Sequence, residues 1–501
     1  AQTLVTLSAG EADLLGSPGR PIVIAPRRSG AAVAESVAPR SADLGVMLAY
    51  SPLHHLLLAD AGVTLVMTSG NVSDEPIAHT DGDALRRLAG IADLFLVHDR
   101  AVHTRTDDSV VRATPGGKPL VLRRSRGYVP DSIDLPEPAG RPILACGAEL
   151  KSTFCLAKGR RAWVGHHVGD LKNYETLSSF SDGIDHFQRL FAVTPELVVH
   201  DMHPDYLSTR YALEREGVEH LGVQHHHAHL AACLAEHGEQ GPAVGAIFDG
   251  TGYGTDGTVW GGELLVGGLA GFERAGFLWP VRMPGGETAI RQPWRMAAAW
   301  LVASLGDDPP LPRALAGVVG DGDWRKVCEL ASKGLASPVT TSAGRLFDAV
   351  AALCGVRARV NYEGQAAVEL EGACRAPADR TYPMPLHEDP VMLDARPTIR
   401  AIVADVEAGA APDLVSARFH ATLADATVRA CALLCQRASV ETVVLSGGVF
   451  QNRTLLEGTR AAIGQRGLRT LVPERLPPND GGISYGQAAI AAFNLERGGA
   501  R

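Results

Sequence analysis

Three apolar stretches of the chain each end in a glycine-containing turn, and this repeated pattern restricts the fold more than any other feature. The stretches are "PILACGAELKST", "AVGAIFDGTGYGTDG" and "ETVVLSGGVFQN". Short runs of apolar residues that end in glycine turns are typical of buried strands. Long Ala- and Leu-rich stretches with a helical pattern separate them, including "SARFHATLADATVRACALLCQRA". The repeated order predicts an α/β fold with two related lobes around a nucleotide cleft.

A proline-rich stretch divides the chain into two parts. The stretch "PDSIDLPEPAGRP" has four prolines and little apolar content, which is typical of a boundary between domains. The sequence therefore predicts one domain over residues 1–133, a linker over 134–142 and a second domain over 143–501. In the first domain, "RPIVIAP" and "GVTLVMTSGN" are expected to form strands and "HTDGDALRRLAGI" a helix, giving a small α/β unit.

Composition and charge exclude several classes of function. Apolar residues make up 46% and charged residues 21% of the 501 positions, with a net charge of −9. No long run of Lys and Arg is present, so neither nucleic acid nor an anionic membrane is an expected partner. No apolar stretch reaches the roughly 18 residues of a membrane span, and no secretory signal is visible, so the cytoplasm is the expected location. The eight cysteines form no CxxC pair, which excludes a zinc ribbon.

The stretch "QHHHAHLAACLAEH" places four histidines within five positions at the start of an apolar helical run. His225 and His229 lie four residues apart, so one helix face can present both to a single ion, while His226 and His227 point elsewhere. The glutamate of an HExxH motif is missing, which excludes a zinc peptidase. The alternative interpretation is a solvated, histidine-rich helix start.

Two aspartates extend this candidate metal site. Asp249 follows an apolar run in "FDGTGYG", and Asp480 lies in the glycine-flanked stretch "PPNDGGISYGQ". Two imidazoles and two carboxylates form a mixed nitrogen and oxygen ligand set that suits iron or zinc.

The three glycine turns are also candidate phosphate sites. "DGTGYGTDG" offers a run of backbone N–H groups that can hold phosphate oxygens, although such a turn can equally be a simple hairpin. In "GAELKST", Lys151, Ser152 and Thr153 follow a predicted strand; the alternative there is a turn with an exposed lysine. In "LSGGVFQN", Gly447 and Gly448 allow the backbone to approach a ligand closely, and Asn452 can donate hydrogen bonds.

The order of motifs along the chain resembles that of one family. The motifs "GAELKST", "QHHHAH", "DGTGYGTDGTVWGGE", "PGGETAIRQPWRMA", "GRLFDAVAALCG", "NYEGQAAVELE", "LSGGVFQN" and "PPNDGGISYGQ" closely resemble the HypF family, the carbamoyltransferases of nickel-iron hydrogenase maturation. The resemblance implies a Kae1-like second domain of the actin and hexokinase-type ATPase class. "MTSGNVSDEPI", "HDRAVHTRTDDSVVR" and "LRRSRGYVP" are similar to a YrdC-like domain, which is N-terminally incomplete here.

The resemblance also implies roles for individual residues. The metal ligands, which would act in catalysis, are His225, His229, Asp249 and Asp480. The expected phosphate contacts in the Kae1-like domain are Asp249, Gly250, Thr251 and Gly252. The expected ribose or base contacts are Asp348, Glu369 and Asn452, of which Asp348 and Glu369 would otherwise be interpreted as surface carboxylates.

A second set of nucleotide contacts is implied in the YrdC-like domain. The residues that match the family's motifs there are Ser69, Gly70, Asn71, Arg105, Asp107, Asp108, Ser109, Arg112, Arg123 and Arg126. The alternative interpretation of each arginine is a solvated side chain on a strand.

The family resemblance implies a reaction and a partner. ATP and Mg²⁺ would convert carbamate, derived from carbamoyl phosphate, to carbamoyl-adenylate, and the acceptor would be the C-terminal cysteine of a HypE-type protein. Family members usually begin with an acylphosphatase domain and CxxC zinc fingers, and neither is visible in this sequence. Carbamate is therefore expected to be supplied from elsewhere. Two alternatives stay open, a small-molecule O-carbamoyltransferase and a non-catalytic nucleotide-binding scaffold.

Overall fold

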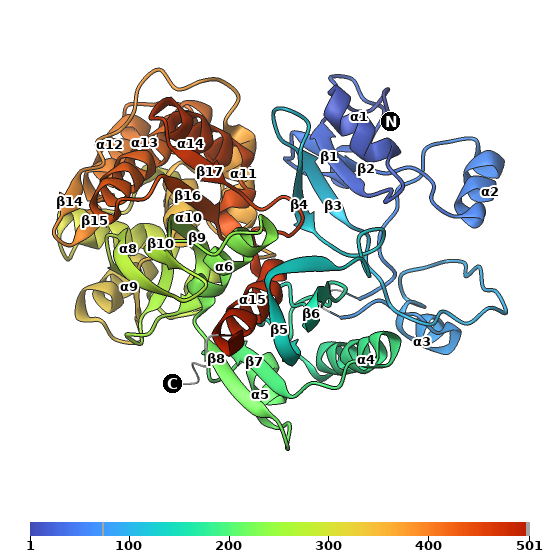
Figure 1. The fold of residues 1–501 in the computed structure, drawn as a ribbon. Helices are drawn as coiled ribbons and strands as arrows, with labels where there is room; N and C mark the ends of the chain where they lie inside the picture. Colours follow the sequence, from blue (N-terminus) through green and yellow to red (C-terminus); the bar gives the residue numbers. More distant parts are fainter. Residues whose placement is uncertain (73–74, 497–501) are drawn as a thin grey trace. The chain divides into compact units, whose positions relative to one another are not determined.

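The residues that the structure describes form three β-sheets and the helices around them (Figure 1). The computed structural model describes residues 1–72 and 75–496. Residues 73–74, inside the motif "MTSGNVSDEPI", and 497–501, at the end of the predicted second domain, lie outside the described residues. The described contacts divide the chain into two units. The first comprises Ala1–Val223, Ala235–Glu239 and the segment from Pro473, and the second comprises Gln224–Leu234 and Gln240–Val472.

The N-terminal part of the first unit is a four-stranded sheet of order β2-β1-β3-β4. Its strands are β1 (Ile22–Pro26), β2 (Asp43–Val46), β3 (Val110–Ala113) and β4 (Pro119–Arg123). The accompanying helices are α1 (Ala9–Gly16), η1 (Glu35–Val37), α2 (Pro52–Ala61) and α3 (Asp81–Arg87). Alternating apolar residues of β1 and β3 pack with α1 into one core, which confirms the predicted small α/β unit.

One predicted strand is absent. The stretch "GVTLVMTSGN" forms no strand in its described residues, whereas "RPIVIAP" forms β1 and "HTDGDALRRLAGI" contains α3. Val66 in this stretch is 73% exposed. A strand requires a neighbour that accepts and donates its backbone hydrogen bonds, and no described strand pairs with residues 62–72. The apolar pattern alone was therefore insufficient to predict a strand.

The rest of the first unit is a second four-stranded sheet of order β6-β5-β7-β8. Its strands are β5 (Ile133–Ala145), β6 (Cys155–Val164), β7 (Leu197–Asp201) and β8 (Glu219–Val223). Its helices are α4 (Tyr174–Phe191), α5 (Leu207–Leu213), η4 (Asp480–Gly482) and α15 (Ile483–Glu496). Helix α15, the last helix in chain order, packs against β5, the first strand of this sheet (Figure 1).

The predicted linker is part of a strand. Residues 134–142 belong to β5, so this stretch is a strand, and the domain boundary placed there stays a prediction. Pro136, Pro138 and Pro142 are tolerated because the pairing of β5 with β6 is interrupted by register shifts there, and β5 pairs with β7 only from Ile143 onward. Proline cannot donate a ladder hydrogen bond and is accepted where pairing is one-sided or interrupted.

The second unit contains the largest sheet, of order β14-β15-β11-β10-β9-β16-β17 with β12 and β13 beside it. Its strands are β9 (Ala243–Tyr253), β10 (Val259–Gly268), β11 (Gly271–Leu278), β12 (Val281–Arg282), β13 (Val339–Thr340), β14 (Leu386–Glu388), β15 (Val391–Leu393), β16 (Thr442–Ser446) and β17 (Arg469–Leu471). β16 runs parallel to β9, with Ile247 paired to Ser446. The residues that follow these two positions therefore meet at one edge of the sheet.

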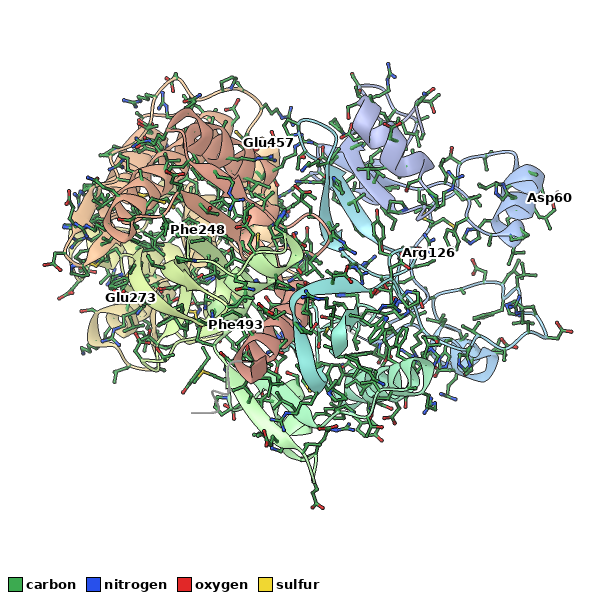
Figure 2. The ribbon with its side chains drawn as sticks, in the orientation of Figure 1. Asp60, Arg126, Phe248, Glu273, Glu457 and Phe493 are labelled. Carbon is green, nitrogen blue, oxygen red and sulfur yellow. The ribbon has the colours of Figure 1, made fainter. Side chains whose placement is uncertain are left out.

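Helices of the second unit surround this sheet. They are α6 (His225–Glu236, whose last two residues group with the first unit), α7 (Thr288–Arg291), α8 (Pro293–Leu305), η2 (Arg313–Leu315), α9 (Asp321–Lys333), α10 (Ala343–Leu353), α11 (Gln365–Ala373), α12 (Arg396–Glu407), α13 (Pro412–Ala438), η3 (Gly448–Gln451) and α14 (Arg453–Gln465). Leu230 and Leu234 of α6 pack on Ile247 of β9. Figure 2 labels Phe248 in the interior, where its ring stacks on Phe450 at 5.4 Å.

Candidate functional site

The four histidines of "QHHHAH" form the buried first turn of α6. His225 and His226 are completely buried, and His229 is 1% exposed. Gln224 precedes the helix, and its side-chain oxygen accepts a hydrogen bond from the backbone N–H of His227. This bond satisfies one of the free N–H groups at a helix start. The alternative of a solvated, histidine-rich helix start is therefore wrong.

Two of these histidines converge on Asp249 at the end of β9. Asp249 Oδ2 lies 3.0 Å from His229 Nε2 and 3.4 Å from His225 Nε2. The three ligand atoms lie within 4.8 Å of one another. Ligands that bind zinc at 2.0–2.1 Å with tetrahedral angles are about 3.3 Å apart. The spacing of this donor set, two imidazoles and a carboxylate, therefore fits a transition metal.

The other carboxylate oxygen of Asp249 is held by the backbone. Oδ1 accepts hydrogen bonds from the N–H groups of Gly250, at 2.7 Å, and Gly448, at 3.2 Å. Burial alone would raise the pKa of Asp249, but the hydrogen bonds from His225 and His229 outweigh burial and hold that pKa well below its usual range. Asp249 is therefore an ionised carboxylate with a fixed orientation.

The two remaining histidines face away from Asp249, as predicted. His227 Nε2 donates to the carbonyl of Gly268 at 2.7 Å. His226 Nδ1 lies 3.2 Å from the side-chain nitrogen of Gln224. Burial lowers the pKa of both histidines, so both are neutral at pH 7 and anchor the helix.

Gly252 provides the space for the histidines. A Cβ atom at this position would lie 2.5 Å from His226 Cε1 and 2.9 Å from His225 Cδ2. Because the approaching atoms belong to buried rings, an added methyl group would displace them. Gly252 was expected to contact phosphate together with Gly250 and Thr251. That role stays a prediction for all three residues.

We expect the substitution Gly252→Ala to weaken metal binding about 10- to 100-fold, the range found when the support of a metal ligand is disturbed. The matched control is Gly317→Ala, because a Cβ at Gly317 meets no atom within 4 Å. Metal affinity would be measured by competition with a chromogenic chelator. Equal affinities for the two variants would contradict this account of Gly252.

The fourth predicted ligand belongs to the first unit. Asp480 is the first residue of η4 and is 7% exposed. The preceding Asn479 caps this turn by accepting a hydrogen bond from the N–H of Gly481. The participation of Asp480 in metal binding stays a prediction.

The glycine pair after β16 lies against β9. Gly447 adopts φ +96°, and a Cβ there would lie 2.3 Å from the carbonyl oxygen of Phe248. Only glycine fits this left-handed, crowded position. The close approach allows the next N–H, that of Gly448, to reach Asp249. Gly447 and Gly448 therefore shape the aspartate site, and their contact with a nucleotide stays a prediction.

Helix α10 begins beside the Asp249–Gly250 backbone. Its N-cap Ser342 donates to the carbonyls of Asp249 and Gly250 and accepts the N–H of Arg345. Ser342 was not among the predicted site residues, although a serine directly before the helical run "AGRLFDA" is a helix-start signal.

Asp348 is buried and not on the helix surface. It is 2% exposed and pairs with Arg345 at 2.8 Å. Burial raises the pKa of Asp348 to about 6, while Arg345 opposes this shift and Glu363 adds to it. The alternative of a surface carboxylate is wrong for Asp348, and its role at a ribose or base stays a prediction.

The other two predicted nucleotide contacts of this unit have structural partners. Glu369 pairs with Arg357 and accepts from Gln365 at 3.0 Å. Asn452 caps α14 by accepting the N–H of Leu455, and its amide nitrogen lies 2.8 Å from His420 Nε2. Both side chains thus have hydrogen-bond partners within the protein. Their contacts with a nucleotide stay predictions.

The "GAELKST" turn of the first unit is fixed by its neighbours. Lys151 adopts φ +46°, and its N–H donates to Asp170 Oδ1 at 2.9 Å. Ser152 is fully buried, and Thr153 donates to the carbonyl of Gly481 at 3.1 Å. The turn thus joins the start of η4 to this sheet, and phosphate binding there stays a prediction.

Some of the predicted YrdC-like contacts line one cavity of about 520 Å³ in the first unit. The predicted residues that line this cavity are Ser69, Asn71, Arg105, Asp107 and Arg123. The volume lies in the range typical of small-ligand sites. The facing wall comes from α4 and from residues 166–170.

The remaining predicted residues of this part do not line that cavity. Ser109 is fully buried and accepts the N–H of Ser125. Asp108 pairs with Arg126, whose guanidinium stacks on Tyr50 at 3.4 Å, and Arg112 pairs with Asp43 at 3.0 Å. These contacts contradict the alternative of freely solvated arginines for Arg112 and Arg126.

Family models match most of the chain. Residues 4–125 match the Sua5, YciO and YrdC model described as "Telomere recombination", residues 138–236 match the "HypF Kae1-like domain", and residues 245–487 match "Carbamoyltransferase, Kae1-like Domain, second subdomain". The predicted α/β class with a YrdC-like part followed by a Kae1-like part is confirmed. Among the described residues, no helix is both long and apolar enough to cross a bilayer.

Curated relatives give the same result. Carbamoyltransferase HypF of Rhodobacter capsulatus is 41% identical over 98% of this chain and 65% of its own length. A carbamoyltransferase HypF homolog of Cupriavidus necator is 37% identical over 71% of this chain and 93% of its own length. The chain spans only 63–65% of several of the full-length relatives it matches.

Solved structures of the same family share the fold. A crystal structure of full-length HypF in a phosphate- and nucleotide-bound form is 39% identical and has a TM-score of 0.94. The match covers 100% of this chain and 78% of that one. A crystal structure of T.kodakarensis HypF is 31% identical, with a TM-score of 0.92, over 99% of this chain and 66% of that one. The sequence, fold and motif order together place this chain in the HypF family of carbamoyltransferases.

Proposed function

We propose that this chain is an ATP-dependent carbamoyltransferase of hydrogenase maturation. It would form carbamoyl-adenylate from carbamate and ATP and pass the carbamoyl group to the C-terminal cysteine of a HypE-type partner. The observation that carries the proposal is the convergence of His225, His229 and Asp249 on one buried point in a chain of the HypF family. A HypF relative solved in a phosphate- and nucleotide-bound form supports the use of a nucleotide.

The reaction divides into two steps that fit the two kinds of domain. In the first, a carbamate oxygen attacks the α-phosphorus of ATP, which gives carbamoyl-adenylate and releases pyrophosphate. In the second, the partner's thiolate attacks the carbamoyl carbon, the bond to the phosphate oxygen breaks, and AMP leaves. The product is an S-carbamoyl cysteine, the precursor of a cyanide ligand. A reactive mixed anhydride of this kind needs a site that excludes water.

We assign the first step to the cavity that residues of the YrdC-like part form together with α4 and residues 166–170. Arg105, Ser69 and Asn71 line this cavity, and the guanidinium of Arg105 offers donors for the phosphate of a nucleotide. Asn71 is itself fixed, because its amide donates to the carbonyls of Val72 and Glu75. Mg²⁺ would accompany ATP as its substrate counter-ion.

We assign the second step to the histidine and aspartate site of the Kae1-like part. His225, His229 and Asp249 would hold an iron or zinc ion, with Asp480 as the predicted fourth ligand. Such an ion, when bound, stabilises negative charge that develops on an oxygen next to it. The chain's own contribution is orientation, because Gly250 and Gly448 fix the Asp249 carboxylate and Gln224 fixes the start of α6.

The test is intact-mass spectrometry of a purified HypE-type partner after incubation with this chain, ATP, Mg²⁺ and carbamoyl phosphate. A second arm adds a separate acylphosphatase to supply carbamate. A mass gain of one carbamoyl group on the terminal cysteine supports the proposal. No gain in either arm, with the partner's cysteine reduced and free, would overturn the assignment of that acceptor.

A further inference from the structure

The loop that precedes α3 brings His79 to the wall of the 520 Å³ cavity. The N–H of Ala78 donates to the carbonyl of Gly70 at 2.9 Å, which fixes the backbone directly before His79. Thr80 then caps α3 by accepting the N–H of Asp83. His79 lies between these two anchors, so its backbone is held on both sides.

The imidazole of His79 accepts a hydrogen bond from Arg105. Arg105 Nε lies 3.0 Å from His79 Nδ1, and both residues line the cavity. Because the guanidinium can only donate, Nδ1 must carry the lone pair and the ring proton must reside on Nε2. His79 is therefore neutral in this arrangement.

The bond to His79 uses only the Nε–H of Arg105. Among the described residues, no hydrogen bond or ion pair engages the two terminal nitrogens of this guanidinium. A guanidinium held by its Nε can offer a planar pair of donors to a phosphate. Arg123, the other cation of the predicted set on this wall, instead donates to the carbonyl of Asp108 and faces Asp107 at 3.7 Å.

We propose that His79 is a positioning residue that orients Arg105 toward the phosphate of a nucleotide in this cavity. The proposal rests on the proposed function, which places the nucleotide there, and adds a residue that the sequence motifs did not indicate. A leucine in place of His79 would leave Nε without its acceptor, and the long side chain of Arg105 would regain rotational freedom.

The same contact predicts a pH dependence. Burial lowers the pKa of His79, Arg105 lowers it further, and Asp83 and Asp182 oppose both effects. Protonation would turn Nδ1 into a donor and place a second positive charge beside Arg105. The Arg105-dependent part of nucleotide affinity should therefore be complete near pH 8 and fall as the pH drops below about 6.5.

The experiment titrates ATP into the chain by calorimetry between pH 5.5 and 8.5. The variants are His79→Leu, His79→Gln, Arg105→Ala and the double variant His79→Leu with Arg105→Ala, and the exposed His55→Gln is the control. At pH 8, His79→Leu should weaken the Arg105-dependent binding about tenfold, the size of one lost hydrogen bond to a charged group. His79→Gln, which keeps an acceptor, should remain within about threefold and lose the acid-side decline.

The outcomes separate the two proposals. If Arg105→Ala weakens ATP binding but His79→Leu, folded by circular dichroism, does not, the role of His79 is wrong and the nucleotide site stands. If Arg105→Ala leaves ATP binding unchanged, the proposed nucleotide site itself is wrong. A double variant that binds no worse than Arg105→Ala alone would show that His79 acts through Arg105.

Discussion

Replacing His229 by alanine is expected to remove the metal and the proposed carbamoyl transfer while the chain stays folded. His229 Nε2 lies closer to Asp249 Oδ2 than His225 Nε2 does, at 3.0 Å against 3.4 Å, and the His229 side chain is 1% exposed. Loss of a metal ligand should weaken metal binding by at least about 100-fold. That factor is the upper end of the loss in metal affinity found when only a residue that hydrogen-bonds to a ligand is mutated. Because a bound ion lowers such a barrier by several kcal/mol, its loss should slow the transfer by about a thousandfold.

The matched control is His227→Ala. His227 lies on the same helix turn, is 6% exposed and donates to Gly268 without facing Asp249. Both variants lose a buried imidazole, so a general effect of the cavity would appear in both. Metal content by mass spectrometry and transfer by intact mass of the partner provide the two measurements. Full transfer by His229→Ala, or equal losses in both variants, would exclude the proposed ligand role.

The second large effect is expected at Arg274, which neutralises a completely buried carboxylate. Glu263 in β10 is 0% exposed. One oxygen accepts the N–H groups of Gly261 and Gly262 and the hydroxyl of Thr341, and the other accepts Arg274 Nε at 2.7 Å. These contacts hold β10 beside Asp249, because Gly262 pairs with Phe248 in the neighbouring strand.

We expect Arg274→Met to lower the free energy of unfolding of the second unit by about 3 kcal/mol, because removal of one partner leaves a buried charge uncompensated. The value lies at the lower end of the usual range because the Arg274 side chain is 19% exposed. Arg274 also binds Asp256 and lies over Trp260 at 4.1 Å, contacts that methionine replaces only in part.

The double variant Glu263→Gln with Arg274→Met tests the cause. Without the buried negative charge, it should be more stable than Arg274→Met alone, as expected for coupled neighbours. Denaturant unfolding followed by tryptophan fluorescence would measure both, since Trp260 lies at the pair. A double variant no more stable than the single one would mean that packing, and not charge, determines the loss.

Much of the candidate site could be predicted from the sequence because it depends on spacing within single elements. The interval between His225 and His229 places both on one helix face, and the glycine after an apolar strand indicates a close turn at Gly447. Such local rules also separated His226 and His227 from the ligand pair. The family motifs then gave the order of the two kinds of domain, which the matched models confirm.

Other features depended on neighbours that are distant in sequence. The apolar stretch at residues 62–71 has a strand pattern but no described strand beside it. The prolines of residues 134–142 fit a strand because β6 pairs with that strand only intermittently. Glu263 and Arg274 form an ion pair only because β10 and β11 are antiparallel neighbours.

By itself, the sequence therefore determined which residues could share a helix face or a glycine turn, and which family's chemistry they match. The tertiary structure decided which of them meet. The parallel pairing of β9 with β16 brings the N–H of Gly448 to a carboxylate 199 residues earlier, and the loop before α3 brings His79 to Arg105. Hydrogen bonds and buried charges act over a few ångströms, so their partners are fixed by strand order and packing, which local sequence patterns do not encode.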